Sequence, residues 1–181
     1  MIGLSLIRNS DSGLRLAMGS HYSRPSGFVG RQLIYEVSFN GILYGYTAGG
    51  SATLNLRGRD KFAKCAWFGP LLHYSINNTF FHVERVNGRY PCRNFVPLVI
   101  SEWRRVVSVD WKKRYGYSVK MFETLVELPR TGKCYIMDGW TEVGVTSGNT
   151  CKRVSGKGTD SYGGMRSWST GNKKRVFCRW P

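Results

Sequence analysis

The sequence predicts a single α/β domain with a mixed, largely antiparallel sheet, flanking helices and a basic C-terminal extension. Three observations carry this prediction. Apolar residues alternate from Gln32 to Phe39, and Asn40-Gly41 then supplies the turn of a hairpin. Apolar residues recur at helical spacing from Val96 to Val107, and an apolar strand pattern follows from Val119 to Leu128. Strands interspersed with helices are typical of α/β folds, and the hairpin makes the sheet mixed.

The first fifty residues predict a strand, a short helix and that hairpin. Ile2, Leu4 and Leu6 alternate with smaller residues, as in a strand, and Leu14–Met18 fits a short helix. The Asn-Gly pair favours a type I′ turn, because that turn needs positive φ at both central positions. The return strand is expected to begin directly after it.

The middle of the chain predicts further strands and one long helix. Leu71–Ile76 and Thr79–Val83 are apolar runs separated by Asn77-Asn78. Adjacent asparagines commonly turn a chain, so a turn is expected there, although asparagine also pairs with adenine edges. Pro97 suits the start of the helix, which is expected to end near residue 109. The strand at 119–128, a basic turn and a segment at 134–144 follow.

The last thirty residues have a different character, so we predict a domain over residues 1–150 and a flexible arm over 151–181. The arm carries eight basic residues against one acid, with five interleaved glycines and several aromatic rings. Such a composition suits contact with a nucleic-acid backbone, and Lys173, Lys174 and Arg175 are the densest basic cluster. A disordered solubilising tail is the alternative interpretation.

Composition points to a polyanionic partner. The 181 residues include 27 lysines and arginines against 11 acids, which gives a net charge of +16. A chain that repels itself in this way is stabilised by DNA, RNA or an anionic membrane surface. No apolar run approaches the roughly 20 residues of a membrane-spanning helix. The N-terminus lacks the basic region of a signal peptide, so a cytoplasmic location is expected.

The cysteines predict neither a disulfide framework nor a metal site. They are odd in number and widely spaced, and no two form a C-x-x-C pair, which favours free thiols. Cys134 has no neighbouring base in the sequence that would activate it as a nucleophile. The five are Cys65, Cys92, Cys134, Cys151 and Cys178.

A set of short motifs occurs in a fixed order over roughly residues 20–150. They are HY (His21, Tyr22), GRQL-Y (30–35), SA (51–52), RD (59–60), NN (77–78), DW--RYGY (110–117), ET-V (123–126), R-GKCY (130–135) and W--VG-T (140–146), with an echo in KKRVF (173–177). This ordered set resembles the DruA family of the Druantia anti-phage defence systems. The resemblance implies a role in anti-phage defence, with the partners of a defence complex.

The same layout is similar to a wider group with an acetyltransferase-type (GNAT) fold, which includes the phage Mu Mom DNA-modification protein. Mom-like proteins modify the exocyclic amine of adenine in DNA. The resemblance implies a GNAT-like fold and a transferase that acts on DNA. His21 and Tyr22 correspond to an HY element that Mom-like proteins carry early in the chain. The other positions that correspond are Glu84, Arg85, Gly132, Tyr135, Trp140 and Gly144.

The chain departs from ordinary acetyltransferases at the loop that binds the cofactor pyrophosphate. In those enzymes glycines and a helix N-terminus present backbone N–H groups to phosphates. The matching segment here, RVNGRYPCRN, has one glycine, and Pro91 lacks an N–H. Acyl-CoA is possible as a donor, but the cofactor is not identified. Arg89 and Arg93 are candidates to hold a phosphate of a cofactor or of nucleic acid.

Three residues are candidates for proton transfer, each with an alternative structural interpretation. His21 lies in a serine-rich loop and is either an acid or base or a surface histidine. Glu123 lies in an apolar strand, where burial would raise its pKa, or it pairs with an arginine. Glu127 is expected on the same strand face. His73 and His82 are expected in the core or at a sheet edge.

Other candidates have binding roles. Arg130 and Lys133 flank a loop and either contact phosphate or are solvated. Tyr135 and Trp140 either stack on a flipped base or pack in the core.

The leading hypothesis is therefore a DNA-directed transferase that modifies a nucleobase amine. A non-catalytic nucleic-acid-binding component of a defence system is the main alternative, and an acyltransferase acting on RNA or protein is a third. The predicted catalytic residues are His21, Glu123 and Tyr135. The predicted contacts with substrate or double-stranded DNA are Tyr22, Asn77, Asn78, Arg85, Arg89, Arg93, Arg130, Lys133, Trp140, Lys173, Lys174 and Arg175.

Overall fold

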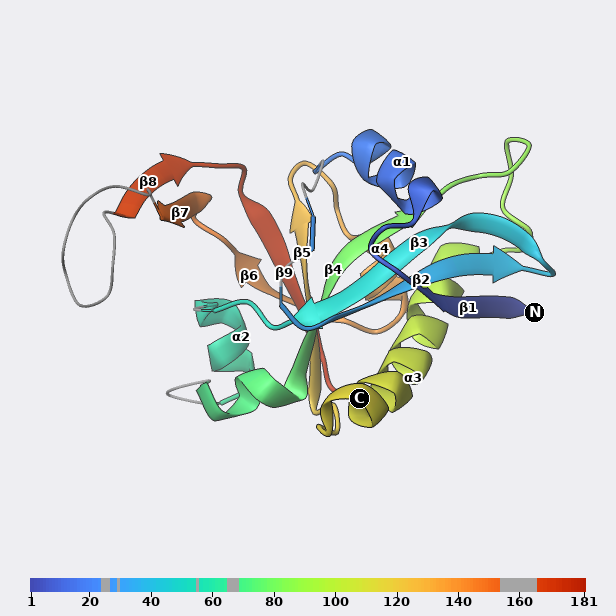
Figure 1. The fold of residues 1–181 in the computed structure, drawn as a ribbon. Coiled ribbons are helices and arrows are strands. Elements are labelled where there is room, and N and C mark those ends of the chain that lie inside the picture. The colour runs from blue at the N-terminus through green and yellow to red at the C-terminus, as the bar shows by residue number, and fades with distance from the viewer. Residues whose placement is uncertain (24–26, 29, 55, 65–68, 154–165) are drawn as a thin grey trace.

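The computed structural model describes residues 1–181 apart from 24–26, 29, 55, 65–68 and 154–165. Seven strands form one mixed sheet in the order β1-β2-β3-β4-β5-β9-β6, with helices packed on it (Figure 1). The prediction of an α/β domain with a mixed, largely antiparallel sheet is confirmed. The elements are β1 (Ile2–Ile7), α1 (Ser12–Ser20), β2 (Gln32–Phe39), β3 (Ile42–Ser51), α2 (Arg57–Phe62), the 3-10 helix η1 (Gly69–Tyr74), β4 (Ser75–Val83), α3 (Phe95–Tyr115), β5 (Met121–Glu127), α4 (Lys133–Met137), β6 (Thr141–Val145), β7 (Asn149–Arg153), β8 (Arg166–Thr170) and β9 (Lys174–Arg179).

The first four strands form an antiparallel meander. The predicted hairpin joins β2 to β3, and its turn residues Asn40 and Gly41 have φ of 49° and 80°. These positive values are what a type I′ turn requires, and glycine adopts them without steric cost. The predicted first strand and short helix are also confirmed as β1 and α1.

The turn expected at Asn77-Asn78 is wrong, because β4 runs without interruption from Ser75 to Val83. A shift of register between Ala48 and Gly49 of β3 leaves Thr79, the residue after the asparagine pair, without an opposite residue. β4 then pairs with β5 in parallel, but only from Ser75 to Asn78. Beyond that point the carboxyl halves of β4 and β5 are no longer paired with each other, which opens the sheet between them.

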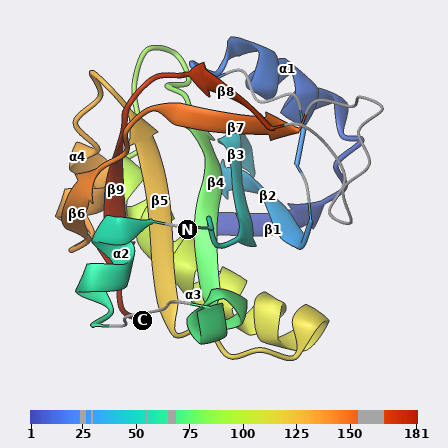
Figure 2. The ribbon, with the colours of Figure 1, turned by 90° about the vertical axis from the view of Figure 1, so that its left-hand side faces the viewer.

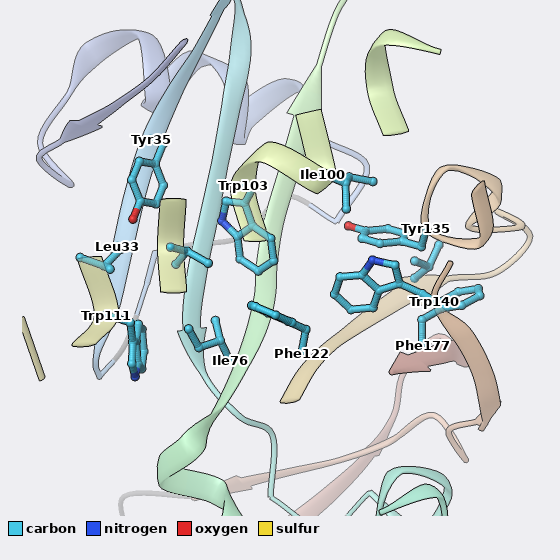
Figure 3. Packing of buried hydrophobic residues seen from close by; sticks show 12 residues of the cluster. Leu33, Tyr35, Ile76, Ile100, Trp103, Trp111, Phe122, Tyr135, Trp140 and Phe177 are labelled. Atoms are coloured by element: carbon cyan, nitrogen blue, oxygen red, sulfur yellow. The ribbon is translucent and has the colours of Figure 1, made fainter. Parts of the chain in front are cut away.

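One long helix closes one face of the sheet. α3 ends at Tyr115, before Gly116, so it is longer than the end near residue 109 that the sequence predicts. Its buried positions include Ile100, Trp103, Val107 and Trp111, spaced three or four residues apart along one face. Figure 3 shows the rings of Trp103 and Trp111 against the strand side chains, in the main hydrophobic cluster of the protein.

The end of the chain corrects the predicted arm. Residues Lys174–Arg179 form β9, which lies between β5 and β6 and pairs antiparallel with both (Figure 2). Val176, Phe177 and Cys178 are buried there. The prediction of a flexible arm is therefore wrong for this strand. β7 and β8, which come between β6 and β9 along the chain, form a separate two-stranded sheet. Residues 154–165 of the predicted arm lie outside the described residues.

Candidate active site

The opening between β4 and β5 is a cavity of about 1120 Å³. Its walls come from the end of α1, the carboxyl halves of β4 and β5, and the segment from Pro129 to Tyr135. Residues far apart in the sequence meet there because α1 and α4 approach the same gap in the sheet. Cavities of this size, lined by apolar groups and a few polar ones, are typical of small-molecule and substrate sites.

His21 lies directly after α1 and is buried at the cavity wall, with only 6% of its surface exposed. Its Nδ1 lies 2.8 Å from Ser23 Oγ, and its ring packs against Phe80 at a centroid distance of 4.8 Å. Burial, together with the nearby His82, lowers the pKa of His21 to about 4. The imidazole is therefore uncharged at neutral pH, which is the form that a general base needs, and it is a weaker base than a free histidine.

His82 is a cavity residue that sequence reasoning placed in the core or at an edge. Its ring lies 5.8 Å from that of His21, and its Nε2 lies 2.8 Å from Glu84 Oε1. Phe80 and His82 are two residues apart on β4, so their side chains share a face of the strand and both line the cavity near His21. That alternation is the signal that would have grouped His82 with the site.

Tyr22 and Arg130 meet across the cavity. The Arg130 guanidinium carbon lies 3.7 Å from the centre of the Tyr22 ring, which is a cation–π contact between the end of α1 and the loop after β5. Lys133 and Lys174 also line the cavity. With Asn77 and Asn78, the structure therefore brings six of the predicted binding residues to one site, and three of them are cationic.

Tyr135 lies in α4 and is buried, with its hydroxyl donating a hydrogen bond of 2.6 Å to Asn78 Oδ1. Burial raises the pKa of Tyr135 well above that of a free phenol, so the hydroxyl keeps its proton. Gly132, which precedes α4, has φ of 66°, and a Cβ there would lie 2.5 Å from the Phe177 ring. A glycine at that position thus lets α4 pack closely and hold Tyr135 at the wall.

Asn78 orients the Tyr135 hydroxyl. Its Nδ2 donates to Thr47 Oγ1 at 3.0 Å and to the Ala48 carbonyl at 3.1 Å. These two acceptors fix the amide so that its oxygen points toward the phenol. Asn78 is therefore a buried positioning residue in a strand.

Glu123 lies behind the cavity wall rather than on it. It is fully buried, forms an ion pair of 2.8 Å with Arg59, and accepts a hydrogen bond of 2.5 Å from the Thr53 N–H. Burial raises the pKa of Glu123, and the Arg59 guanidinium opposes that rise. The salt-bridge alternative from the sequence is confirmed.

Asn77 connects this ion pair to the cavity. Its Nδ2 donates to Thr53 Oγ1 at 2.9 Å, and both side chains belong to residues of the cavity wall. Its Oδ1 is buried and has no hydrogen-bond partner among the described residues. Such an acceptor is uncommon in a folded protein and adds a polar group beside the site.

Trp140 does not line the cavity but packs in the hydrophobic core, which is the second of the two roles that the sequence predicts for it. It is buried, its ring lies 5.2 Å from that of Tyr135, and its Nε1 donates to Asp138 Oδ2 at 2.8 Å (Figure 3). The prediction that Trp140 stacks on a substrate base is wrong for this arrangement. Tyr135 packs in the same cluster but also reaches the cavity.

Several predicted basic contacts lie away from the cavity. Arg85, Arg89 and Arg93 are exposed in the loop between β4 and α3, where the Arg85 guanidinium lies over the Tyr90 ring. Arg175 forms an ion pair with Glu142 at 2.8 Å. The structure does not place these residues, or the exposed Lys173, on the cavity wall.

Two further side chains complete the description. Cys134 lines the cavity, and burial raises the pKa of its thiol, so it is not activated as a nucleophile. Glu127 accepts a hydrogen bond from Asn172 at 2.6 Å.

In the described part of the chain, no three His, Cys, Asp or Glu residues are grouped to hold a metal ion. None of the described helices is long and apolar enough to span a membrane.

Comparisons with known proteins identify the fold. No family model matches the sequence, and no curated protein matches it. Solved structures do match, several of them over nearly the whole chain. A probable acetyltransferase from Staphylococcus epidermidis is 8% identical over 99% of both chains, with a TM-score of 0.54. An N-acetyltransferase from Staphylococcus aureus is 10% identical over 99% of this chain and 98% of that chain, with a TM-score of 0.53.

The chain has the GNAT acetyltransferase fold. A third structure with this fold, a putative acetyltransferase from Salmonella typhimurium with its cofactor acetyl-CoA, is 9% identical over 99% of this chain and 93% of that chain, with a TM-score of 0.52. At these identities the likeness concerns the GNAT fold alone. The resemblance to DruA and to Mom stays a prediction.

Proposed function

We propose that this protein is an acyl-type transferase that modifies an amine of a DNA base in the cavity between β4 and β5. The observation that carries the proposal is the pairing of His21 and Tyr135 at one cavity. One is a neutral imidazole that accepts a proton, and the other is a protonated phenol that donates one. A base and an acid that face one site are what group transfer between an amine and an activated donor needs.

The reaction would join the amine nitrogen to the acyl carbon of the donor. An exocyclic base amine is a weak nucleophile, because its lone pair is delocalised into the ring, so positioning and base catalysis are both required. His21 would take the proton that the nitrogen loses as the new C–N bond forms. As the bond between the acyl carbon and the carrier breaks, the Tyr135 hydroxyl would release its hydrogen bond to Asn78 Oδ1 and protonate the departing atom. Asn78 holds that hydroxyl in place.

The donor's carrier is not assigned, because the loop before α3 does not fit a backbone phosphate cradle. Val86 and Arg89 use each other's N–H and C=O groups, at 3.2 and 3.3 Å, and Pro91 has no N–H. The exposed side chains of Arg85, Arg89 and Arg93 remain able to hold phosphates from this loop. Any acyl-CoA would therefore be held there by arginine side chains, with no step of the reaction assigned to it.

Charge supports a nucleic-acid acceptor. Arg130, Lys133 and Lys174 surround the cavity, and the chain as a whole carries +16. Phosphates on either side of a target base would neutralise these cations. The rings of Tyr22 and Phe80 each lie within stacking distance of the His21 ring, and the three offer an aromatic surface for an extruded base.

Mass spectrometry of nucleosides tests the proposal. DNA from cells that produce the protein should contain a nucleoside heavier than the parent by the transferred group. A His21→Gln variant should lower its yield by about a hundredfold or more, since a positioned base contributes that much. If DNA from cells that produce the wild-type protein contained no new nucleoside, the proposal would be contradicted.

A non-catalytic nucleic-acid-binding module is the second candidate, and the unfit phosphate loop is the observation that favours it. It predicts unmodified DNA together with tight, salt-sensitive binding. In that case the His21→Gln variant would bind DNA as the wild type does. The same nucleoside measurement, combined with a binding titration, separates the two functions.

A further inference from the structure

A second cationic surface lies at the other end of the sheet from the cavity. β4 and β5 begin at Ser75 and Met121, whereas the cavity lies at their carboxyl halves. At the beginning of these strands η1 approaches the last turns of α3, at the lower edge of Figure 2. The Lys120 N–H donates to the Tyr74 carbonyl at 2.7 Å, which ties the two segments together. We call this the α3-end surface; its members are His73, Lys112, Lys113, Tyr117, Lys120 and Arg114, which also lines a small pocket together with Asp11.

Aromatic rings form the base of this surface. The Tyr117 ring stacks on the exposed His73 ring, with a centroid distance of 5.7 Å and an interplanar angle of 23°. Behind it the Arg31 guanidinium lies 5.3 Å from the Tyr117 ring, 5.5 Å from Trp111 and 5.8 Å from Tyr115. Three rings around one cation hold the aromatic groups in a fixed arrangement.

A hydrogen-bonded anchor makes this arrangement rigid. The Tyr115 hydroxyl accepts from the Gln32 N–H and donates to the Gln32 carbonyl, both at 2.9 Å. The helix end is thereby fixed to the first residue of β2. A preformed surface loses little conformational entropy when it binds a ligand, which favours binding.

The cations of the α3-end surface lack acidic partners. Lys112, Lys113, Arg114 and Lys120 are exposed, and in the described part of the chain none of them forms an ion pair. Arg114 lies 5.8 Å from the Tyr115 ring and Lys120 lies 4.9 Å from the Tyr74 ring. Other surface cations are neutralised, for example Arg105 by Glu102. Positive charge at the α3-end surface is thus available to an anion.

We propose that the α3-end surface binds a single-stranded segment of nucleic acid, at a site separate from the cavity. The exposed lysines and Arg114 would contact phosphates, and a base would stack on the open face of His73. Nucleic acid is favoured over other polyanions because this surface alternates cations with flat rings, which matches a strand of phosphates and bases. Binding there involves no group transfer, so it extends beyond the proposed function and does not require it.

Fluorescence anisotropy with a labelled oligonucleotide tests this proposal across a range of salt concentrations. A Lys112→Gln/Lys113→Gln variant should bind the strand about tenfold more weakly at low salt and reduce the slope of log affinity against log salt by about 1.4. An Arg57→Gln/Lys61→Gln variant is the matched control, since it removes the same charge from exposed positions of another helix. It should weaken binding by much less.

A His73→Ala variant tests the stacking. It should weaken binding of the single strand by at least about fivefold and change the affinity for a fully paired duplex much less. The proposal is overturned if the lysine pair and the control pair weaken binding equally, or if His73→Ala leaves the single-strand affinity unchanged. It is also overturned if anionic lipid vesicles bind the surface in a lysine-dependent way while the strand does not.

The two proposals fail in different ways. The anisotropy measurement does not depend on catalysis, so absence of a modified nucleoside does not affect it. Conversely, the Lys112→Gln/Lys113→Gln change should weaken strand binding by the same factor in a His21→Gln background as in the wild type, because His21 lies at the other end of the sheet. A lysine effect that disappears in that background would contradict a separate site.

Discussion

Two pairs of buried polar side chains lie at or directly behind the cavity wall, and they differ in what they face. Glu123 and Arg59 form an ion pair sealed behind the cavity wall, whereas His21 and Tyr135 are buried at the wall itself. The first pair satisfies its own charges and secures Thr53. The second pair leaves one group able to accept a proton and the other able to donate one. A shifted pKa therefore points to a catalytic role only where the titrating group also lines a cavity that a substrate can enter.

The largest effect is expected from breaking the sealed pair. An Arg59→Met variant leaves the Glu123 carboxylate buried without its counter-charge, which should lower the free energy of unfolding by about 3–5 kcal/mol. A double variant, Arg59→Met/Glu123→Gln, should regain most of that stability, because no fully buried charge remains and Asp60, which also pairs with Arg59, is partly exposed to water. Urea unfolding of the three proteins measures both differences.

The same variant has a predictable pH dependence. Burial raises the pKa of Glu123, and loss of the opposing guanidinium raises it further. A carboxyl whose pKa is higher in the folded state than in the unfolded state binds protons preferentially when folded, so its stability contribution is lost as pH rises. The destabilisation of Arg59→Met should therefore diminish as the pH is lowered. A destabilisation independent of pH would contradict the role given to this pair.

The second effect comes from His21, with the opposite sign. Its pKa is about 4 in the folded state against 6.5 for a free histidine. The unfolded chain binds the proton more readily between these values, so the wild type should lose up to about 3 kcal/mol of stability as pH falls from 6.5 to 4. His82 and Arg130 face the ring and favour this shift, whereas Glu127 opposes it.

A His21→Gln variant provides the comparison, because glutamine does not titrate. Its unfolding free energy should depend less on pH over that interval than that of the wild type. Equal pH dependence of the two proteins would show that the imidazole is not held neutral at the cavity wall.

The smallest of the three effects is expected from Tyr135→Phe. The variant removes the hydroxyl that donates to Asn78 Oδ1 and leaves that buried oxygen without its partner, which should cost about 1–2 kcal/mol of stability. Nucleoside yield should fall by more than this loss of folded protein explains, because the proton donor is gone. Full activity of a folded Tyr135→Phe variant would exclude the phenol from the chemistry.

Local signals in the sequence predicted the elements that depend on local chemistry. The β2–β3 hairpin follows from Asn40-Gly41, whose positive φ values only a few residue types adopt readily. The α1 and α3 helices follow from periodicity. The end of α3 was placed too early because its last turns are basic on the exposed side, and only Trp111 and Tyr115 pack in or against the core there.

Elements that depend on distant partners were not predictable in the same way. Asn77 and Asn78 have the composition of a turn, but β3 and β5 pair on either side of them and hold them in a strand. β9 reads as a basic tail, although Val176 and Phe177 alternate into the two faces of the sheet once β5 and β6 pair with it.

The candidate site shows the same division. His21 and Tyr135 were selected as separate residues, and the cavity that joins them comes from the gap between two strands. His82 was missed because its alternation with Phe80 on β4 groups it with the site only once Phe80 is known to line the cavity. Glu123 was selected for its burial, which is correct, but the position of Arg59 decides what that burial means.

One measurement separates the sealed pair from the cavity pair most directly. Nucleosides are quantified from the DNA of cells that produce equal amounts of folded wild type, His21→Gln or Arg59→Met/Glu123→Gln. The account predicts a modified nucleoside in the wild type, a comparable yield from the double variant, and almost none from His21→Gln. A yield that survives in His21→Gln but disappears in the folded double variant would assign the chemistry to Glu123 and contradict the account.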